Sequence, residues 1–252
     1  MKGAVRLIMR VLTAGWLLLR GALHVARGYW RIRLRFPKIS LAEREAEVQA
    51  WARELLRLWR IDLQVHGEPP LQGPVLLVSN HISWLDIVVM HAARYCRFVS
   101  KADVKSWPVI GTLASGAGTL YITRESRRDA LRTVHHMADA LKQGEVLAVF
   151  PEGTTSNGLA LLPFHANLLQ AAISADAPVQ PVALQFIDSD TGEISLAPCY
   201  VGDDTLVSSV WRTLTTPGVR AVVSYGQSQK AESRERREWA EELRHSVDAL
   251  RK

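Results

Sequence analysis

The chain has 252 residues, of which 48% are hydrophobic and 22% are charged, values that fit one globular α/β domain with an appendage. Its two cysteines, Cys96 and Cys199, lie far apart and in no Cys-x-x-Cys or Cys/His cluster, which argues against a disulfide scaffold or a zinc module. Lysine and arginine outnumber aspartate and glutamate by 31 to 25, so an anionic partner is expected, either nucleic acid or a membrane surface.

The basic excess lies in residues 1–40, which contain nine lysines or arginines and no acidic residue. On a helix at about 100° per residue, one sector roughly 100° wide is polar, and it holds Lys2, Arg6, Arg10, Thr13, Arg20, His24, Arg27 and Arg31. The other side is apolar and includes Leu12, Trp16 and Leu19, while Leu17 interrupts the polar stripe. This pattern predicts an amphipathic helix lying in the bilayer interface. The alternative is a helix docked on its own domain with a solvated basic side.

A spanning helix and a cleaved signal peptide both fit this segment less well. The longest stretch without a charge, Val11–Leu19, is shorter than the ~18 to 20 residues that cross a bilayer, and basic residues continue after it. Pro37 ends the first helix, and Ser40-Leu41-Ala42-Glu43 is a capping box that opens a second helix to about Trp59. Residues 1–60 are therefore expected to form a membrane-associating pair of helices.

Residues 61–252 are expected to form the catalytic domain, because short apolar runs alternate with helical stretches there. The predicted strands are Ile61–Val65, Val75–Ser79, Arg97–Val99, Thr119–Ile122, Leu147–Phe150, Val179–Leu184 and Val219–Ser224. The predicted helices are Trp84–Ala93, Arg128–Lys142, Ala166–Ser174, Thr205–Leu214 and Ser233–Leu250. Such alternation predicts an α/β fold with a single mixed sheet flanked by helices.

A candidate acid–base pair follows the strand Val75–Ser79, in Asn80-His81-Ile82-Ser83-Trp84-Leu85-Asp86. A carboxylate five residues after the histidine, across a turn into a helix, can bind Nδ1 and leave Nε2 free as a proton acceptor. His81 is then equipped as a general base that activates a hydroxyl. The spacing taken alone more often belongs to a structural histidine.

Two further blocks place polar groups after strands. Phe150-Pro151-Glu152-Gly153-Thr154-Thr155-Ser156 supplies backbone N–H groups and hydroxyls at the lip of the sheet, and Gly118-Thr119-Leu120-Tyr121-Ile122-Thr123-Arg124 places an arginine beyond a strand end, suited to an anionic headgroup. Either block alone is commonly a surface turn or a surface arginine. Ala177-Pro178-Val179-Gln180-Pro181 resembles the proline-framed entry of a buried strand.

In this order, from about Val75 to Leu184, these blocks resemble the glycerolipid acyltransferase family, and NHISWLD with FPEGTTS is a specific pair of motifs. The resemblance implies transfer of an acyl group from acyl-CoA or acyl carrier protein to a lysophospholipid hydroxyl, of the 1-acylglycerol-3-phosphate O-acyltransferase type, in phospholipid biosynthesis. It implies that His81 is the base and Asp86 its partner. It further implies that Arg124, Glu152, Gly153 and Thr154 bind the acceptor, with Lys101 as a looser match, and that neither cofactor nor metal is needed.

One departure concerns the acceptor. Family enzymes that acylate 1-acylglycerol-3-phosphate usually carry arginine where this chain has Thr155, and the run to Leu161-Leu162-Pro163-Phe164 also resembles members that take lyso-ornithine lipid or lysophosphatidylethanolamine. The expected partners are thus membrane lipids, a lysolipid acceptor and an acyl donor, with no nucleic acid. The expected location is peripheral or monotopic, on the cytoplasmic face of the inner membrane.

Three alternatives to acyl transfer fit the sequence less well. A Ser-His-Asp hydrolase built on Ser83 lacks a G-x-S-x-G elbow. A metal site on His81 and Asp86 needs further ligands, and His135 and His136 point about 100° apart on a helix. A non-enzymatic basic-armed protein that binds nucleic acid or membranes fits the N-terminal charges, but tryptophan and leucine opposite the arginines suit lipid better.

Overall fold

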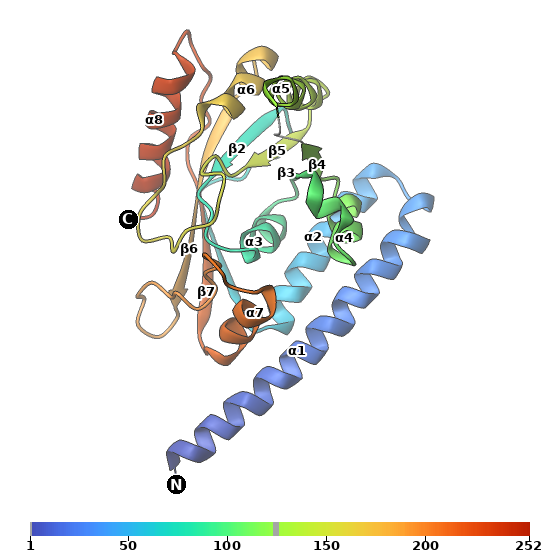
Figure 1. Ribbon diagram of the computed structural model, residues 1–252, viewed down its shortest axis with the longest axis vertical. Coiled ribbons are helices and arrows are strands. Elements are labelled where there is room, and N and C mark those ends of the chain that lie inside the picture. The colour runs from blue at the N-terminus through green and yellow to red at the C-terminus, as the bar shows by residue number, and fades with distance from the viewer. Residues whose placement is uncertain (1, 123–125) are drawn as a thin grey trace.

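Seven strands form one mixed sheet in the computed structural model (Figure 1), which describes residues 2–122 and 126–252, without the side chains of 2–4, 6, 7 and 127. The sheet order is β1-β7-β6-β2-β5-β3-β4. Neighbouring strands are parallel, except that β6 and β7 are antiparallel. The strands are β1 (Asp62–His66), β2 (Val75–Ser79), β3 (Arg97–Lys101), β4 (Leu120–Ile122), β5 (Val146–Val149), β6 (Val179–Asp188) and β7 (Val219–Tyr225). The single mixed sheet predicted from the sequence is confirmed.

Helices cover both faces of the sheet, as Figure 1 shows. One face carries α1, α2, α3 and α7, and the other carries α5, α6 and α8. The α-helices are α1 (Lys2–Leu34), α2 (Leu41–Leu58), α3 (Leu85–Ala93), α4 (Ile110–Gly116), α5 (Arg127–Lys142), α6 (Leu169–Ala175), α7 (Leu206–Thr215) and α8 (Arg236–Ala249), with 3-10 turns at Phe36–Lys38, Ala102–Ser106 and Ala166–Leu168.

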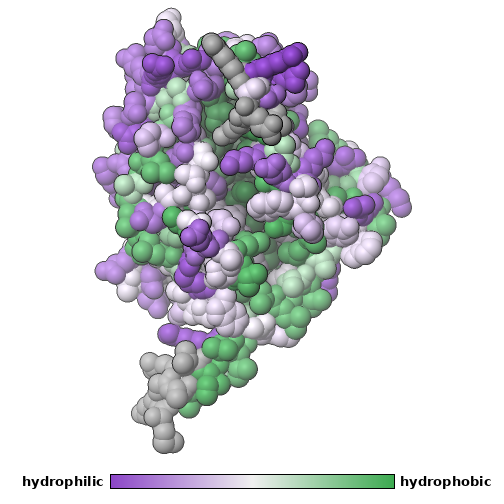
Figure 2. All heavy atoms as spheres, in the orientation of Figure 1, coloured by the Kyte–Doolittle hydropathy of each residue, from purple (hydrophilic) through white to green (hydrophobic). Residues whose placement is uncertain are grey.

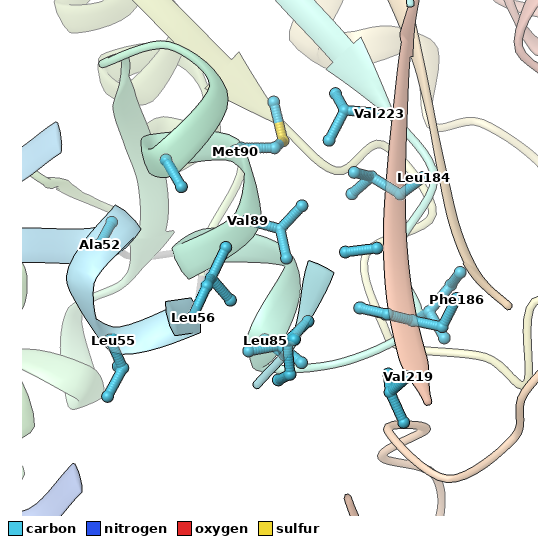
Figure 3. Packing of buried hydrophobic residues seen from close by; sticks show 14 of the residues in the cluster. Ala52, Leu55, Leu56, Leu85, Val89, Met90, Leu184, Phe186, Val219 and Val223 are labelled. Atoms are coloured by element: carbon cyan, nitrogen blue, oxygen red, sulfur yellow. The ribbon is translucent and has the colours of Figure 1, made fainter. Parts of the chain in front are cut away.

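The central strand β2 is buried on both faces. Val75 and Leu77 pack with the α3 side of the sheet, whereas Leu76 and Val78 pack with the α5 side, as the alternation of side chains along a strand requires. Helix α3 lies between the sheet and α2, and Figure 3 shows Leu85 and Val89 directed into this layer. The start of α3, where Asp86 lies, is therefore fixed by the core.

The bounds of several elements differ from the sequence-based prediction by a few residues, and two differences are larger. Strand β6 continues past Leu184 to Asp188, because it pairs with β7 along that whole extension. The short helix α4 was not predicted, since two glycines give it a low helix propensity. It is held by packing on α1, where a Cβ placed on Gly116 would come 2.5 Å from Cδ1 of Ile32.

The two N-terminal helices are present, and the capping box of α2 is confirmed. Ser40 Oγ accepts the backbone N–H of Glu43 at 3.3 Å, and the Glu43 carboxylate accepts the backbone N–H of Ser40 at 2.8 Å. The 3-10 turn at Phe36–Lys38, with Pro37 in its first positions, separates the helices. The chain direction then reverses, so that α2 returns beside α1 (Figure 1).

Helix α1 docks on the domain along a stripe of small residues. A Cβ on Gly21 would come 2.3 Å from Nε1 of Trp59, and one on Gly28 would come 2.5 Å from Nε1 of Trp51. Leu17 and His24 lie on this same stripe, and both are buried. The sequence assignment of His24 to a solvated polar stripe is therefore wrong. Leu17, which interrupts that stripe in the sequence, faces the protein and is buried.

The opposite side of α1 is apolar and exposed, and Figure 2 shows green atoms along this part of the molecule. Its exposed residues are Val5, Ile8, Met9, Val11, Leu12, Trp16, Leu18, Leu19, Leu23, Trp30 and Leu34. The segment Ile8–Lys38 contains an 18-residue stretch that, by length and composition alone, is apolar enough to cross a membrane. Only 22% of this stretch is buried inside the protein. An exposed apolar surface of this extent is typical of contact with lipid or with a protein partner.

Candidate active site

The carboxyl end of β2 is locked to its neighbour by a buried amide. The side chain of Asn80 accepts the backbone N–H of Leu184 at 2.8 Å and donates to the Leu184 carbonyl at 3.0 Å. These two bonds extend the pairing of β2 and β6 by one position past Ser79. The following residue, His81, therefore leaves the sheet from a rigid base.

His81 and Asp86 form the predicted pair. Nδ1 of His81 donates to Oδ2 of Asp86 at 2.8 Å, and the Asp86 carboxylate is fully buried while 19% of the His81 side chain is exposed. The same Oδ2 accepts the backbone N–H groups of Ile82 at 2.6 Å and Ser83 at 2.9 Å. Because three donors converge on one oxygen, both the carboxylate and the histidine tautomer are fixed, and Nε2 is left as the free ring nitrogen.

An aromatic stack holds the imidazole ring in place. Phe150 lies parallel to His81, with ring centroids 3.9 Å apart and an interplanar angle of 4°, and Phe98 stacks behind Phe150 at 5.5 Å. The sequence-based strand ended at Phe150, but β5 ends at Val149, which frees Phe150 to turn toward the histidine. Phe150 was part of the quoted motif, yet nothing in the sequence showed which ring it would contact.

Glu152 joins the two motif loops from inside the protein. It is 4% exposed, and its two carboxylate oxygens accept the backbone N–H groups of His81 at 3.0 Å and Leu162 at 3.2 Å. Burial raises the pKa of the Glu152 carboxyl, against the opposing effect of these two donors. The carboxylate thus positions the backbone of His81, and both oxygens are engaged within the protein.

Gly153 and Thr154 form the exposed tip of this loop. Gly153 has φ +72°, a left-handed conformation that favours glycine, and its N–H closes a turn onto the Phe150 carbonyl at 3.1 Å. The ring of His165 lies beside it, 3.2 Å from where a Cβ of residue 153 would be. The sequence alone does not single out His165, because residues 154–164 separate it from Gly153 along the chain.

Further bonds tie the loop to its surroundings. The backbone N–H of Ser156 donates to the His81 carbonyl at 2.9 Å, and that of Tyr200 donates to the Ile82 carbonyl at 3.1 Å. The Thr155 hydroxyl donates to the Tyr200 carbonyl. Thr155, the position at which the resemblance leads us to expect arginine, therefore closes a structural contact in this chain.

The two predicted cationic positions, Lys101 and Arg124, differ in what the structure describes. Lys101 ends β3 and is exposed, at the same edge of the sheet as His81 because β2, β5 and β3 run parallel. No hydrogen bond or ion pair joins it to His81, Asp86 or Glu152 in the part of the chain that the structure describes. Arg124 lies outside the described residues.

The residues on which the hydrolase and metal-site alternatives depend have the following positions in the structure. Ser83 is fully buried, and its hydroxyl accepts the Leu85 N–H at 3.2 Å, which makes it part of the turn before α3. His135 and His136 are both exposed on α5. Among residues 2–122 and 126–252, no group of three or more His, Cys, Asp or Glu side chains could hold a metal ion.

Comparisons with known proteins show which proteins this chain is similar to. Residues 62–185 match a family model described as Acyltransferase. A 1-acyl-sn-glycerol-3-phosphate acyltransferase of Neisseria gonorrhoeae is 37% identical over 210 residues, covering 82% of this chain and 81% of the relative. A lyso-ornithine lipid O-acyltransferase of Pseudomonas aeruginosa is 40% identical over 186 residues, covering 70% of each chain.

One solved structure shares the fold over nearly the whole length. The crystal structure of the 1-acyl-sn-glycerophosphate acyltransferase PlsC from Thermotoga maritima superimposes with a TM-score of 0.69 and covers 98% of both chains, at 18% sequence identity. The similarity therefore includes the N-terminal helices as well as the sheet.

Proposed function

This chain belongs to the acyltransferase family, and from that premise we propose that it moves a fatty acyl group from a thioester to a free hydroxyl of a lysolipid. The observation that carries the proposal is the His81–Asp86 pair, in which a buried carboxylate holds Nδ1 of a partly exposed histidine and leaves Nε2 as the free ring nitrogen. A base of this kind is suited to an acceptor that has a hydroxyl to deprotonate.

In the proposed reaction, Nε2 of His81 takes the proton of the acceptor hydroxyl as its oxygen attacks the thioester carbonyl carbon. The new C–O bond forms, the C–S bond breaks, and the imidazolium returns its proton to the departing thiolate. The buried negative charge of Asp86 stabilises the imidazolium between these two steps. General base catalysis by a positioned histidine contributes about 10²- to 10⁴-fold.

The surrounding loop is assigned a positioning role and a binding role. Glu152 has both carboxylate oxygens on backbone N–H groups, which supports a role in holding His81 rather than in touching the acceptor. Gly153 and Thr154 are exposed in the same loop as Glu152, which holds the backbone of His81, and they are proposed to contact the substrate. Lys101 and Arg124 stay proposed as cations for the acceptor headgroup.

The acceptor is proposed to be 1-acylglycerol-3-phosphate or lyso-ornithine lipid, since relatives named for each of these are 37% and 40% identical to this chain. The acyl donor is proposed to be acyl-CoA or acyl carrier protein, with no metal or organic cofactor. Thr155 in place of the usual arginine removes one cation from a phosphate pocket. This favours testing both acceptors side by side.

The membrane location is proposed from α1. Its exposed apolar side includes Trp16, Leu19 and Leu23, while its opposite side packs on the domain through Gly21 and Gly28. A helix that is docked on one side and apolar on the other is suited to lie in one leaflet. We place it on the cytoplasmic face, where acyl-CoA and acyl carrier protein are available.

The test is a panel of lysolipid acceptors, offered in mixed micelles with one labelled acyl-CoA or one acyl carrier protein donor, with the products read by mass. We expect a diacyl product from at least one of the two acceptors, and none from the His81→Ala variant. A variant that retains near-wild-type turnover would overturn the mechanism. Release of free fatty acid without an acylated product would overturn the assignment of acyl transfer to a lipid.

A further inference from the structure

A basic groove lies between α1 and α2, away from the candidate active site. Its volume is about 640 Å³. The walls carry five arginines and one carboxylate, namely Arg20, Arg27 and Arg31 from α1 and Arg53, Arg57 and Glu54 from α2. A groove with this balance of charges is suited to an anionic ligand.

The α1 wall supplies the available cations. The carboxylate of Glu54 is paired with Arg57, and Nε of Arg53 donates to the Ala92 carbonyl at 2.8 Å. For Arg20, Arg27 and Arg31, no ion pair is formed with any residue of the described ranges 2–122 and 126–252. All three arginines are exposed and line the groove, and the guanidinium of Arg20 also lies 6.0 Å from the centre of the Trp16 ring.

The floor of the groove is rigid and uncharged. His24 stacks on Trp51 with ring centroids 5.1 Å apart, its Nε2 lies 3.0 Å from the Trp51 carbonyl, and Trp51 Nε1 donates to the His24 carbonyl at 3.3 Å. Burial lowers the pKa of His24 below its ordinary value, which disfavours a positive charge on the floor. Gly28 completes the hollow, because a Cβ there would collide with Trp51.

The groove arginines of α1 lie next to the apolar side of the helix, which favours a ligand with both an anionic and an apolar part. At about 100° per residue, Arg27, Arg20 and Arg31 fall between the exposed apolar side and the buried docking stripe. Leu23, also in the groove, is 53% exposed on the apolar side. The opposite border of α1 faces a second hollow, whose lining is mostly apolar but includes Arg33 and Lys105. Three arginines of α1 thus lie along the border next to the groove, against one, Arg33, along the opposite border. The groove border meets the bilayer surface when the apolar side enters lipid.

We propose that the groove between α1 and α2 binds the phosphate headgroup of an anionic phospholipid. Guanidinium groups grip phosphate oxygens with paired hydrogen bonds, and Leu23 with the adjoining apolar side of α1 accommodates the start of an acyl chain. A free phosphate would not use that apolar border. An acidic carrier protein would need a broad basic surface, and here the cations lie along a groove that adjoins the apolar side.

The test compares two pairs of substitutions on the same helix. The groove pair is Arg27→Gln with Arg31→Gln, and the matched pair is Arg10→Gln with Arg33→Gln, which removes the same charge from α1 outside the groove. Binding of full-length protein is measured on vesicles of phosphatidylcholine alone and on vesicles containing phosphatidylglycerol. Glutamine is a good helix former, so equal unfolding midpoints are expected and are checked by circular dichroism.

Loss of one arginine near an anionic surface weakens vesicle binding about fivefold. Each pair removes two arginines, so this electrostatic part of the loss is the same for both pairs. We expect the groove pair to lose about tenfold more than the matched pair on phosphatidylglycerol vesicles, because hydrogen bonds to charged groups are lost too. Binding to phosphatidylcholine alone should be unchanged. Equal losses for the two pairs would overturn the proposal in favour of diffuse attraction.

A second variant separates charge from geometry. Arg27→Lys with Arg31→Lys keeps the charge but removes the planar fork, so a partial loss on phosphatidylglycerol is expected, and wild-type binding would refute a built site. Inorganic phosphate and a carrier-protein donor are tested in parallel. Two outcomes, each with unchanged vesicle binding, would overturn the proposal. If inorganic phosphate stabilises the wild type but not the groove pair, the groove binds free phosphate. If the groove pair loses only turnover with the carrier-protein donor, the groove binds that protein.

Discussion

Replacing Asp86 tests how much of the catalysis comes from its negative charge. Its Oδ2 accepts Nδ1–H of His81 and the backbone N–H groups of Ile82 and Ser83. In Asp86→Asn, the amide oxygen can take the place of Oδ2 and keep all three bonds. The histidine tautomer is then preserved, and the loss in kcat comes from the charge that stabilises the imidazolium. The new amide NH2 takes the buried place of Oδ1, which has no hydrogen-bond partner among the described residues, so some stability is lost as well.

The size of that loss follows from the geometry. A unit charge at about 4 Å from the imidazolium, at an effective dielectric constant of about 20, contributes about 4 kcal/mol. This corresponds to a fall in kcat of roughly 10³-fold. Asp86→Ala should be similarly inactive and also less stable, because it leaves the buried N–H groups of Ile82 and Ser83 without an acceptor, at about 1 to 3 kcal/mol each.

Both variants are assayed for acyl transfer with saturating acceptor and donor, and their free energies of unfolding are measured by urea titration. Asp103→Asn, an exposed carboxylate after β3, serves as the matched control and should behave as wild type. If Asp86→Asn turns over within tenfold of wild type while His81→Ala is inactive, the charge of Asp86 does not assist the base, and the reasoning fails.

Three other changes have separate readouts. Glu152→Gln should remove a pH dependence of the free energy of unfolding. Burial raises the folded pKa of Glu152 above its ordinary value, so the stability of the wild type relative to the variant should fall as pH rises through the folded pKa. Urea titrations that show a rise would contradict this. Gly153→Ala should lower both stability, by about 1 kcal/mol, and kcat/KM, because φ is +72° and the added Cβ crowds His165; unchanged values would remove the glycine from the site. Leu12→Asn with Leu19→Asn should shift the protein from the membrane to the soluble fraction on centrifugation, since each leucine loses about 1.5 to 3 kcal/mol of burial in lipid; continued sedimentation with membranes would place the anchor elsewhere.

Local patterns in the sequence determined the elements. The apolar run of β2 indicated a buried strand, and Ser40 with Glu43 indicated the start of α2, because hydrophobic alternation and capping act over a few neighbouring residues. The spacing of His81 and Asp86 also spans a single turn, so their contact could be predicted locally. The joint presence of two specific motifs was enough to indicate the family.

Contacts between distant segments were decided only by the tertiary structure. Nothing in the sequence showed that Phe150 would stack on His81, or that both oxygens of Glu152 would be used inside the protein, because these contacts depend on how parallel strand ends meet at one edge of the sheet. The helical pattern of α1 correctly gave an amphipathic helix, but two of its sides could face the protein. The side that carries Gly21 and Gly28 faces the protein, because only residues without a Cβ allow Trp59 and Trp51 to approach the helix so closely.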